Sequence, residues 1–346
     1  MCIRDSAWSD LDRQRTQYVT LHKWFRLFIR FALAAQMFDY GMAKVIPTQF
    51  PAPSLVTLVE PLGQLSVTDL LWVSIGASTP YQIFTGVAEM LAGVLLIVPR
   101  TTLFGALIAL ADMVQVFSLN MSYDFGLKQI SLHLILMTLF LIAPDAQRLM
   151  NVFFQNRPVG PSSSGAPLFR TPKANRLALM AQVAYGLFLI AMFTRISVSY
   201  WYGPGGGGSP KSPLYGIWEV GRLTIDGEQR PPAENDYDRR WRRVIFDAPE
   251  MIVFQRTDDS FAHYGAAIDT NGKSIALTKG NRKTWGARFA FDRPSADRLI
   301  LDGEMDSHKI HLQLNLIDFD SFRLINSGFR WIRPPDLARA GDGPSY

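Results

Sequence analysis

Ionisable side chains interrupt stretches of this chain that are otherwise apolar enough to form membrane helices. Asp39, Glu89 and Asp112 lie within three such stretches, and Lys44 lies at the edge of the first. A charged side chain in hydrocarbon costs roughly 2.5–3.5 kcal/mol on insertion scales, so each one needs a partner, a water-filled cavity or a function. Neighbouring carboxylates in such surroundings are suited to proton exchange with a bound ligand. The sequence therefore predicts a polar site inside a small helix bundle.

These four residues are expected at similar depths in the membrane. If the first stretch runs outward, Asp39 and Lys44 lie in its outer half. Glu89 lies near the middle of the second stretch, between two glycines that allow a neighbouring helix to approach closely. Asp112 lies in the middle-to-outer part of the third stretch. We therefore predict that they share a pocket that opens to the outside.

Three further polar residues extend the predicted pocket where the third stretch leads into the fourth. Asn120 follows the third stretch, Lys128 opens the fourth, and His133 lies about one turn later. Lys128 and Lys44 would balance the carboxylates, and His133 could carry protons. Alternatively, His133 is only a hydrogen-bonded neighbour, and all these groups are interhelical ion pairs and hydrogen bonds that fix the register of the bundle.

The sequence does not favour a metal site. No group of His, Cys, Asp or Glu has the spacing of a known metal centre, and a haem held by two histidines would need a second histidine within the membrane helices. The only cysteine is Cys2, so one chain can form neither an internal disulfide nor a C-x-x-C redox pair.

Five stretches are long enough, or nearly so, to cross a membrane, and they cover residues 24–45, 81–98, 101–119, 129–149 and 177–200. Pro99 and Arg100 separate the second from the third by a tight turn, which predicts a helical hairpin. Basic residues gather before the first stretch and between the fourth and fifth, whereas residues 46–80 contain no Lys or Arg. The positive-inside rule therefore predicts a cytoplasmic N-terminus and an extracytoplasmic C-terminal half.

Residues 46–80 contain five prolines with apolar residues and Trp72 between them. Two interpretations remain open for this segment. It forms either a short amphipathic or re-entrant cap on the bundle, with Trp72 at headgroup level, or an ordered loop that packs on the helix ends.

From residue 214 onward, short strands separated by turn signals replace the apolar stretches. The candidates are residues 215–225, 241–246, 251–256, 262–268, 273–277, 285–291, 297–301, 309–316 and 321–331. Eight or nine short strands without intervening helices predict an up-and-down antiparallel barrel, with a sandwich as the alternative.

A tryptophan and an arginine at the two ends of this region resemble the lipocalin arrangement. Gly216-Ile217-Trp218 opens the first predicted strand, and Arg330 lies in the last. The tryptophan would plug one end of the barrel, with the cation over its ring, so both residues have a structural role. Such a barrel implies one small apolar ligand, and the alternative is an interior filled by side chains.

The charge distribution separates the two halves of the chain. Residues 1–202 carry 15 Lys and Arg against 10 Asp and Glu, whereas residues 203–346 carry 20 of each sign. The balanced second half gives no electrostatic reason to expect a nucleic-acid partner.

We predict a cytoplasmic tail (1–22), a four-helix transmembrane bundle (23–155), a cytoplasmic linker (156–176), a fifth transmembrane helix (177–202), a flexible Gly/Pro-rich linker (203–213), an extracytoplasmic lipocalin-like barrel (214–334) and a tail (335–346).

The bundle also resembles a known family. Residues 40–44 (YGMAK) match a G-x-x-K feature, Glu89 matches an acidic residue of the second span, and residues 120–133 with Ala143-Pro144-Asp145 are similar to the turn and fourth span of one branch. Over about residues 24–155 the chain thus resembles the DoxX-like membrane proteins. This resemblance implies a four-helix bundle, usually bacterial, with relatives that are subunits of a thiosulfate:quinone oxidoreductase or of oxidative-stress complexes. The fifth helix and the barrel depart from the family pattern, so no substrate is implied.

Together, these observations predict a multi-pass protein of the bacterial inner membrane. The leading hypothesis is a redox-linked component with a quinone-like ligand in the outward pocket, although no motif decides whether the chain is itself an enzyme. Proton exchange is assigned to Glu89, Asp112 and His133, and the rest of the pocket to Asp39, Lys44, Asn120 and Lys128. The alternatives are a non-enzymatic barrel that captures a lipid or other apolar molecule, and an assembly subunit of a membrane complex.

Overall fold

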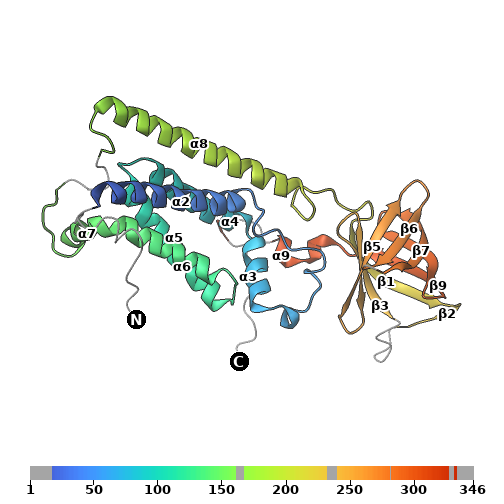
Figure 1. Cartoon of the computed structure of the whole chain (residues 1–346). Coiled ribbons are helices and arrows are strands. Elements are labelled where there is room, and N and C mark those ends of the chain that lie inside the picture. Colours follow the sequence, from blue (N-terminus) through green and yellow to red (C-terminus); the bar gives the residue numbers. More distant parts are fainter. Residues whose placement is uncertain (1–17, 161–166, 232–239, 281, 327–330, 333–346) are drawn as a thin grey trace, which may run out of the picture. The chain divides into compact units, whose positions relative to one another are not determined.

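The computed structural model describes residues 18–160, 167–231, 240–280, 282–326 and 331–332 (Figure 1). The chain divides into two compact units. The first contains the chain up to Ile46 together with Ile83–Ser197, and the second contains Pro47–Gln82 together with the chain from Val198 onward. The predicted fold class is confirmed, because a helical region is followed by a closed antiparallel β-barrel.

The first unit is a helix bundle. Its helices are α2 (Val19–Val45), α4 (Thr79–Ile97), α5 (Thr102–Ser122), α6 (Lys128–Ile142), α7 (Ala146–Phe153) and α8 (Pro172–Tyr202). Four stretches are long and apolar enough to cross a membrane, namely α4, α5, Lys128–Phe153 and α8. They correspond to the second to fifth predicted spans, and we place the protein in a membrane on this basis.

Helix α2 covers the first predicted span but is not among these four candidates. The reason is its composition, because it carries five charged residues in 27. Its fully buried side chains, Leu33, Ala34, Met37 and Phe38, nevertheless belong to one apolar core with residues of α4, α5, α6 and α8. Helix α2 is therefore an integral part of the bundle.

The second unit is built around an antiparallel barrel. Its strands are β1 (Gly216–Ile225), β2 (Glu228–Gln229), β3 (Trp241–Phe246), β4 (Met251–Arg256), β5 (Phe261–Asp269), β6 (Ser274–Lys279), β7 (Arg282–Ser295), β8 (Arg298–Met305) and β9 (His308–Leu316). Strands β3 to β9 pair in sequence order, and β9 pairs with β1 to close an eight-stranded barrel. The two-residue β2 extends only the end of β1.

The ninth predicted strand, residues 321–331, is wrong. The described part of this segment forms a 3-10 turn, Phe319–Ser321, and a short helix, α9 (Arg323–Asn326). The Asp318 carboxylate accepts a hydrogen bond from the Asp320 N–H at 2.9 Å, which caps the turn. Because β9 already pairs with β1, the barrel offers no free edge to which another strand could add.

Large side chains fill the interior of the barrel. Trp218, Phe246, Phe254 and Phe289 are at most 2% exposed and belong to one cluster that draws residues from every long strand. A barrel of eight strands has an interior about wide enough for its own side chains. The interior is therefore a packed core.

Residues 47–82 pack on the outside of this barrel. Leu55 covers an apolar patch formed by Ile217, Ile245 and Val253, all of which are fully buried. The Leu55 N–H donates to the Asp247 carboxylate at 3.1 Å. Further along the segment, α3 (Val67–Gly76) begins with a capping box. The segment is therefore part of the barrel unit.

The predicted linker at residues 203–213 forms turns. The Gly208 N–H donates to the Trp201 carbonyl at 3.0 Å. A Cβ atom at Gly207 would lie only 2.3 Å from the Trp201 ring. The absence of a side chain at Gly207 thus lets the backbone lie directly against the indole.

The contact between Asp247 and Leu55 leads to a prediction about pH. Burial raises the pKa of the Asp247 carboxyl above its usual 3.8, and this effect exceeds the opposing effects of the Leu55 N–H and of Lys211. At a pH between the usual pKa of 3.8 and the raised pKa of the folded protein, the folded state binds more protons than the unfolded state. The free energy of unfolding therefore falls as the pH rises through this range. Asp247→Asn keeps an acceptor for the Leu55 N–H but removes the ionisable group, so the variant does not lose stability in this way.

We therefore expect the melting temperature of Asp247→Asn to rise relative to that of the wild type as the pH increases from below 3.8 toward neutrality. Thermal unfolding followed by tryptophan fluorescence across this pH range measures the difference. A wild type that gains stability over the variant with rising pH would contradict the prediction.

Candidate functional site

Helices α2 and α4 approach each other closely through two glycines. A Cβ atom at Gly41 would lie 2.9 Å from the Gly86 carbonyl oxygen, and one at Gly86 would lie 2.7 Å from that of Gly41. The same two helices also meet one turn before Gly41 and two turns after Gly86, where a Cβ atom at Gly93 would lie 2.7 Å from the Phe38 ring. The close approach expected from the glycines around Glu89 is thus confirmed.

This approach brings Lys44 and Glu89 together. Each lies three residues after the contacting glycine of its helix, and residues at this spacing share a helix face. The Lys44 Nζ donates to Glu89 Oε1 at 2.5 Å. Lys44 is 7% exposed and Glu89 is 1% exposed, so the pair is buried in the bundle.

A second carboxylate from α5 joins the pair. Asp112 is close enough to Glu89 for a hydrogen bond between the two carboxyl groups, and the Lys44 charge acts on both. Glu89 Oε2 and Asp112 Oδ2 are buried and have no other hydrogen-bond partner among the described residues. A hydrogen bond between two carboxyl groups requires a proton on one of them. We call Lys44, Glu89 and Asp112 the charged triad.

The net charge of the triad also indicates that one of its carboxyl groups is protonated. It contains one cation and two carboxylates, so full ionisation would leave an uncompensated negative charge among apolar residues. An isolated buried charge is costly, and a buried group neutralises instead where it can. The arrangement is therefore suited to hold one exchangeable proton.

Among the described contacts, the other residues predicted for this pocket form no hydrogen bond or ion pair with the triad. Asp39 is half-buried on α2. The Asn120 amide donates to Ser131 Oγ at 3.2 Å and so joins α5 to α6. Lys128 pairs with Asp124 four residues earlier. His133 is exposed, and its Nδ1 lies 2.7 Å from the Gln129 carbonyl of its own helix.

Sequence reasoning missed a second buried polar cluster. Arg30 on α2 is 6% exposed and donates to the Gln182 side chain on α8 and to Thr102 Oγ1 at 3.4 Å. One turn earlier, Arg26 donates to the Leu141 carbonyl oxygen at 3.1 Å. The four-residue spacing of these arginines on an apolar helix was the available signal, because it places both on one face.

In the barrel, Trp218 lies on β1 within the apolar core. It is fully buried, and its Nε1 donates to the Leu214 carbonyl at 3.0 Å. A Cβ atom at Gly216 would lie 2.5 Å from the Leu316 side chain, which accounts for the glycine of the motif. The Arg293 guanidinium lies 5.5 Å from the centroid of the Trp218 ring. Arg330, which was predicted to lie there, is outside the described residues.

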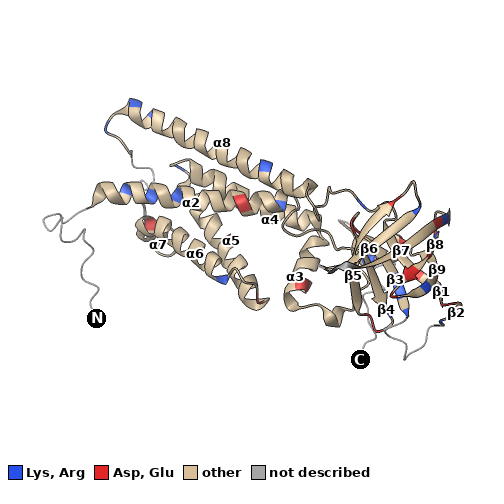
Figure 2. Cartoon of the chain, turned by 45° about the vertical axis from the view of Figure 1, so that its right-hand side comes forward, with Lys and Arg blue, Asp and Glu red and all other residues tan. Residues whose placement is uncertain are grey.

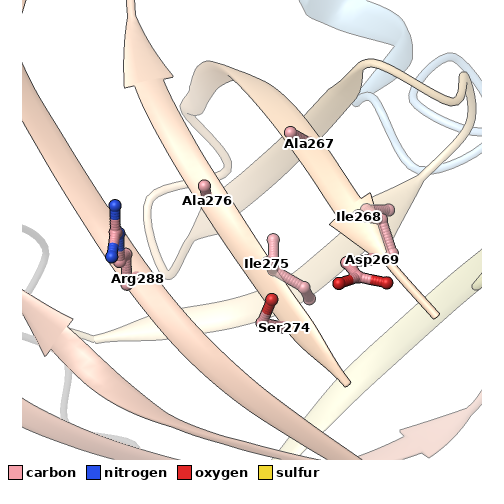
Figure 3. A pocket seen from close by; sticks show the side chains of 7 residues that line it. All are labelled: Ala267, Ile268, Asp269, Ser274, Ile275, Ala276 and Arg288. Carbon is pink, nitrogen blue, oxygen red and sulfur yellow. The ribbon is translucent and has the colours of Figure 1, made fainter. Parts of the chain in front are cut away.

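The barrel surface has a cavity of about 390 Å³ between β5, β6 and β7 (Figure 3). Its polar side chains are Asp269, Ser274 and Arg288. The Asp269 carboxylate accepts hydrogen bonds from the N–H groups of Asn271 and Gly272 at 3.0 Å, so it already caps the turn between β5 and β6. This cavity shows no arrangement typical of catalysis. Among the described residues, no group of three or more His, Cys, Asp or Glu could hold a metal ion.

Comparison with known proteins gives one informative match. No family model and no solved structure matches the chain. The chain is 35% identical over 131 residues to the protein named "Uncharacterized protein YwoB" of Bacillus subtilis (strain 168). The match covers 80% of that protein but 38% of this chain, so the relative is less than half as long and lacks the length for both units. By this similarity, the chain belongs to the same family as Bacillus subtilis YwoB.

Proposed function

We propose that this protein is a redox-linked membrane component in which the charged triad exchanges protons with a quinone-like ligand. The observation that carries the proposal is the pair of buried carboxyl groups, Glu89 and Asp112, that share one Lys44 cation. Reduction of a quinone to a quinol takes up two protons and two electrons. The triad would pass the protons to the ligand one at a time and regain each from water, and a redox-active partner subunit would supply both electrons.

The proposal takes α2 as a fifth transmembrane helix. Its charged residues lie on either side of an uncharged stretch, and Arg26, Arg30 and Lys44 each donate a hydrogen bond to a group of another helix. Residues 31–38 between them carry no charge. Internal pairing of this kind is how charged side chains are tolerated within membrane helices.

The resemblance to DoxX-like proteins supports the same proposal. In that family Lys44 and Glu89 correspond to recurring positions of the first two spans, and these are two of the three triad residues. With the basic residues on the inner side, the protein would lie in a bacterial inner membrane, with Lys44 in the outer half of α2 and the barrel outside.

The packed interior of the barrel bears on the alternative function. Because Trp218, Phe246, Phe254 and Phe289 fill it, an apolar ligand inside the barrel would have to displace core side chains. The observation favours a barrel that docks on a partner protein. We therefore assign the ligand to the bundle.

The test is the quinone content of the protein purified from native membranes with a mild detergent. Solvent extraction and mass spectrometry measure the ratio of quinone to protein for the wild type, Glu89→Gln and Asp112→Asn. Asp124→Asn is the matched control, because Asp124 is an exposed carboxylate that pairs with Lys128. We expect both triad variants to lose most of the quinone and the control to retain it.

Two results would contradict the proposal. One is a wild-type protein that carries no quinone, and the other is a quinone content that the triad variants and the control share. Helix content by circular dichroism and elution as a single species show that each variant is folded.

A further inference from the structure

An apolar cavity of about 410 Å³ lies in the bundle between the beginnings of α2 and α8. Its volume is within the range of small-molecule pockets, about 300–1,000 Å³. Among its lining residues only Gln182 carries an amide or charged side chain, and the others include Leu27, Ala178 and Ala181. The Gln182 side chain is engaged by Arg30, so the polar end of the cavity is satisfied and the rest is apolar.

Two aromatic pairs wall this cavity. Trp24 of α2 meets Phe169, with 6.0 Å between the ring centroids, and Phe31 of α2 meets Tyr185 of α8 at 5.4 Å. Trp24, Phe169 and Tyr185 are each 41–49% exposed, so the cavity is open to its surroundings along the side of the bundle. Tryptophan and tyrosine are enriched where hydrocarbon meets the headgroups.

Basic residues surround the same end of the two helices. Lys23, Arg170, Lys173 and Arg176 each adjoin a residue that lines the cavity, and all four are exposed. None of them forms an ion pair with another described residue. Residues 19–31 and 167–178 contain no Asp or Glu. Figure 2 shows blue bands of Lys and Arg near the beginnings of α2 and α8.

We propose that this cavity binds one acyl chain of an anionic phospholipid, whose phosphate is held by Lys173, Arg176 and Lys23. An apolar cavity beneath unpaired basic residues at the level of an aromatic belt complements both parts of such a lipid. Basic pockets between helices on the cytoplasmic side of membranes recognise anionic headgroups in this manner. The bound lipid would fix α8 against α2 beside the contact between Arg30 and Gln182.

The experiment uses the full-length protein in nanodiscs of phosphatidylcholine that contain a minor fraction of phosphatidylglycerol. After extraction into detergent, native mass spectrometry identifies the retained lipids. We expect the wild type to retain phosphatidylglycerol in excess of its share in the bilayer. Lys173→Gln with Arg176→Gln should lower this preference by roughly fivefold for each charge removed, since each basic residue near an anionic surface contributes about that much.

Ala178→Phe places a bulky side chain in the cavity and should abolish retention of either lipid. Arg195→Gln is the matched control, because Arg195 is an exposed arginine near the other end of α8. Glu89→Gln, which should remove the quinone, is expected to leave the phospholipid in place, so the two proposals can fail separately. Equal retention by the wild type, the charge variants and Ala178→Phe would overturn this inference, as would a retained quinone in place of phospholipid.

Discussion

Lys44→Met is expected to lower the free energy of unfolding by about 3–5 kcal/mol, the usual cost of removing one partner of a buried ion pair. The substitution keeps the length and apolar stem of the side chain, so the loss reports the missing charge. Two carboxyl groups, Glu89 and Asp112, would then share the site without any cation. Denaturant titration in detergent micelles, followed by circular dichroism, measures the change.

The reason for the effect can be checked within the same pair. Lys44→Met combined with Glu89→Met removes both members of the ion pair, and replacement of a buried pair by apolar residues is often neutral. The remaining Asp112 carboxyl group can neutralise by binding a proton. We expect the double variant to recover most of the lost stability. Lys128→Met is the surface control, because an exposed pair four residues apart on a helix contributes only about 0.3–0.5 kcal/mol. A double variant as unstable as Lys44→Met would contradict this explanation.

Trp218→Ala is expected to destabilise the barrel by about 3–5 kcal/mol, the range for deletion of a large aromatic side chain from a core. Trp218 is fully buried, packs within the largest apolar cluster of the barrel and donates to the Leu214 carbonyl. The variant leaves a cavity and an unsatisfied carbonyl oxygen. Thermal unfolding followed by near-ultraviolet circular dichroism measures the loss of barrel packing.

Trp331→Ala provides the control for the barrel prediction. Trp331 is 91% exposed, so its removal should change the stability by less than about 0.5 kcal/mol. If the two tryptophan variants unfolded at the same temperature, Trp218 would not be the plug of the barrel.

Much of the barrel could be predicted from sequence because its signals are local. Strands β3 and β4 have the predicted bounds, since turn residues mark their ends and apolar residues recur within them. The pairing that closes the barrel was harder to predict from sequence, because it joins residues of β1 and β9 that are almost a hundred positions apart. The strand predicted at residues 321–331 was wrong for the same reason, because local signals did not show that β9 already pairs with β1.

The contact of residues 47–82 with the barrel also had a signal that was not used. Residues 244–246 and 252–254 are continuous apolar runs, whereas a strand with one solvated face alternates. Such runs indicate that both faces are covered, and Ile245 and Val253 are indeed covered by Leu55. Which segment would cover them could not be predicted from the strands alone.

In the bundle, the sequence predicts which ionisable residues are costly to place among apolar helices. It does not predict which of these residues contact one another. Lys44, Glu89 and Asp112 come together because Gly41 and Gly86 let two helices touch, and a third helix adds Asp112. His133 and Lys128 were assigned to the same pocket by depth alone. Rotation about the helix axis decides the outcome, and both side chains are instead engaged by residues four positions earlier.

The central claim is that Glu89 and Asp112 share one proton beside Lys44. Infrared spectroscopy of the protein in membranes at neutral pH tests it through the carbonyl stretch of a protonated carboxyl group. We predict this band in the wild type and its loss in both Glu89→Gln and Asp112→Asn, because each variant leaves one carboxylate for one cation. A wild type without the band, or a band that both variants retain, would contradict the claim.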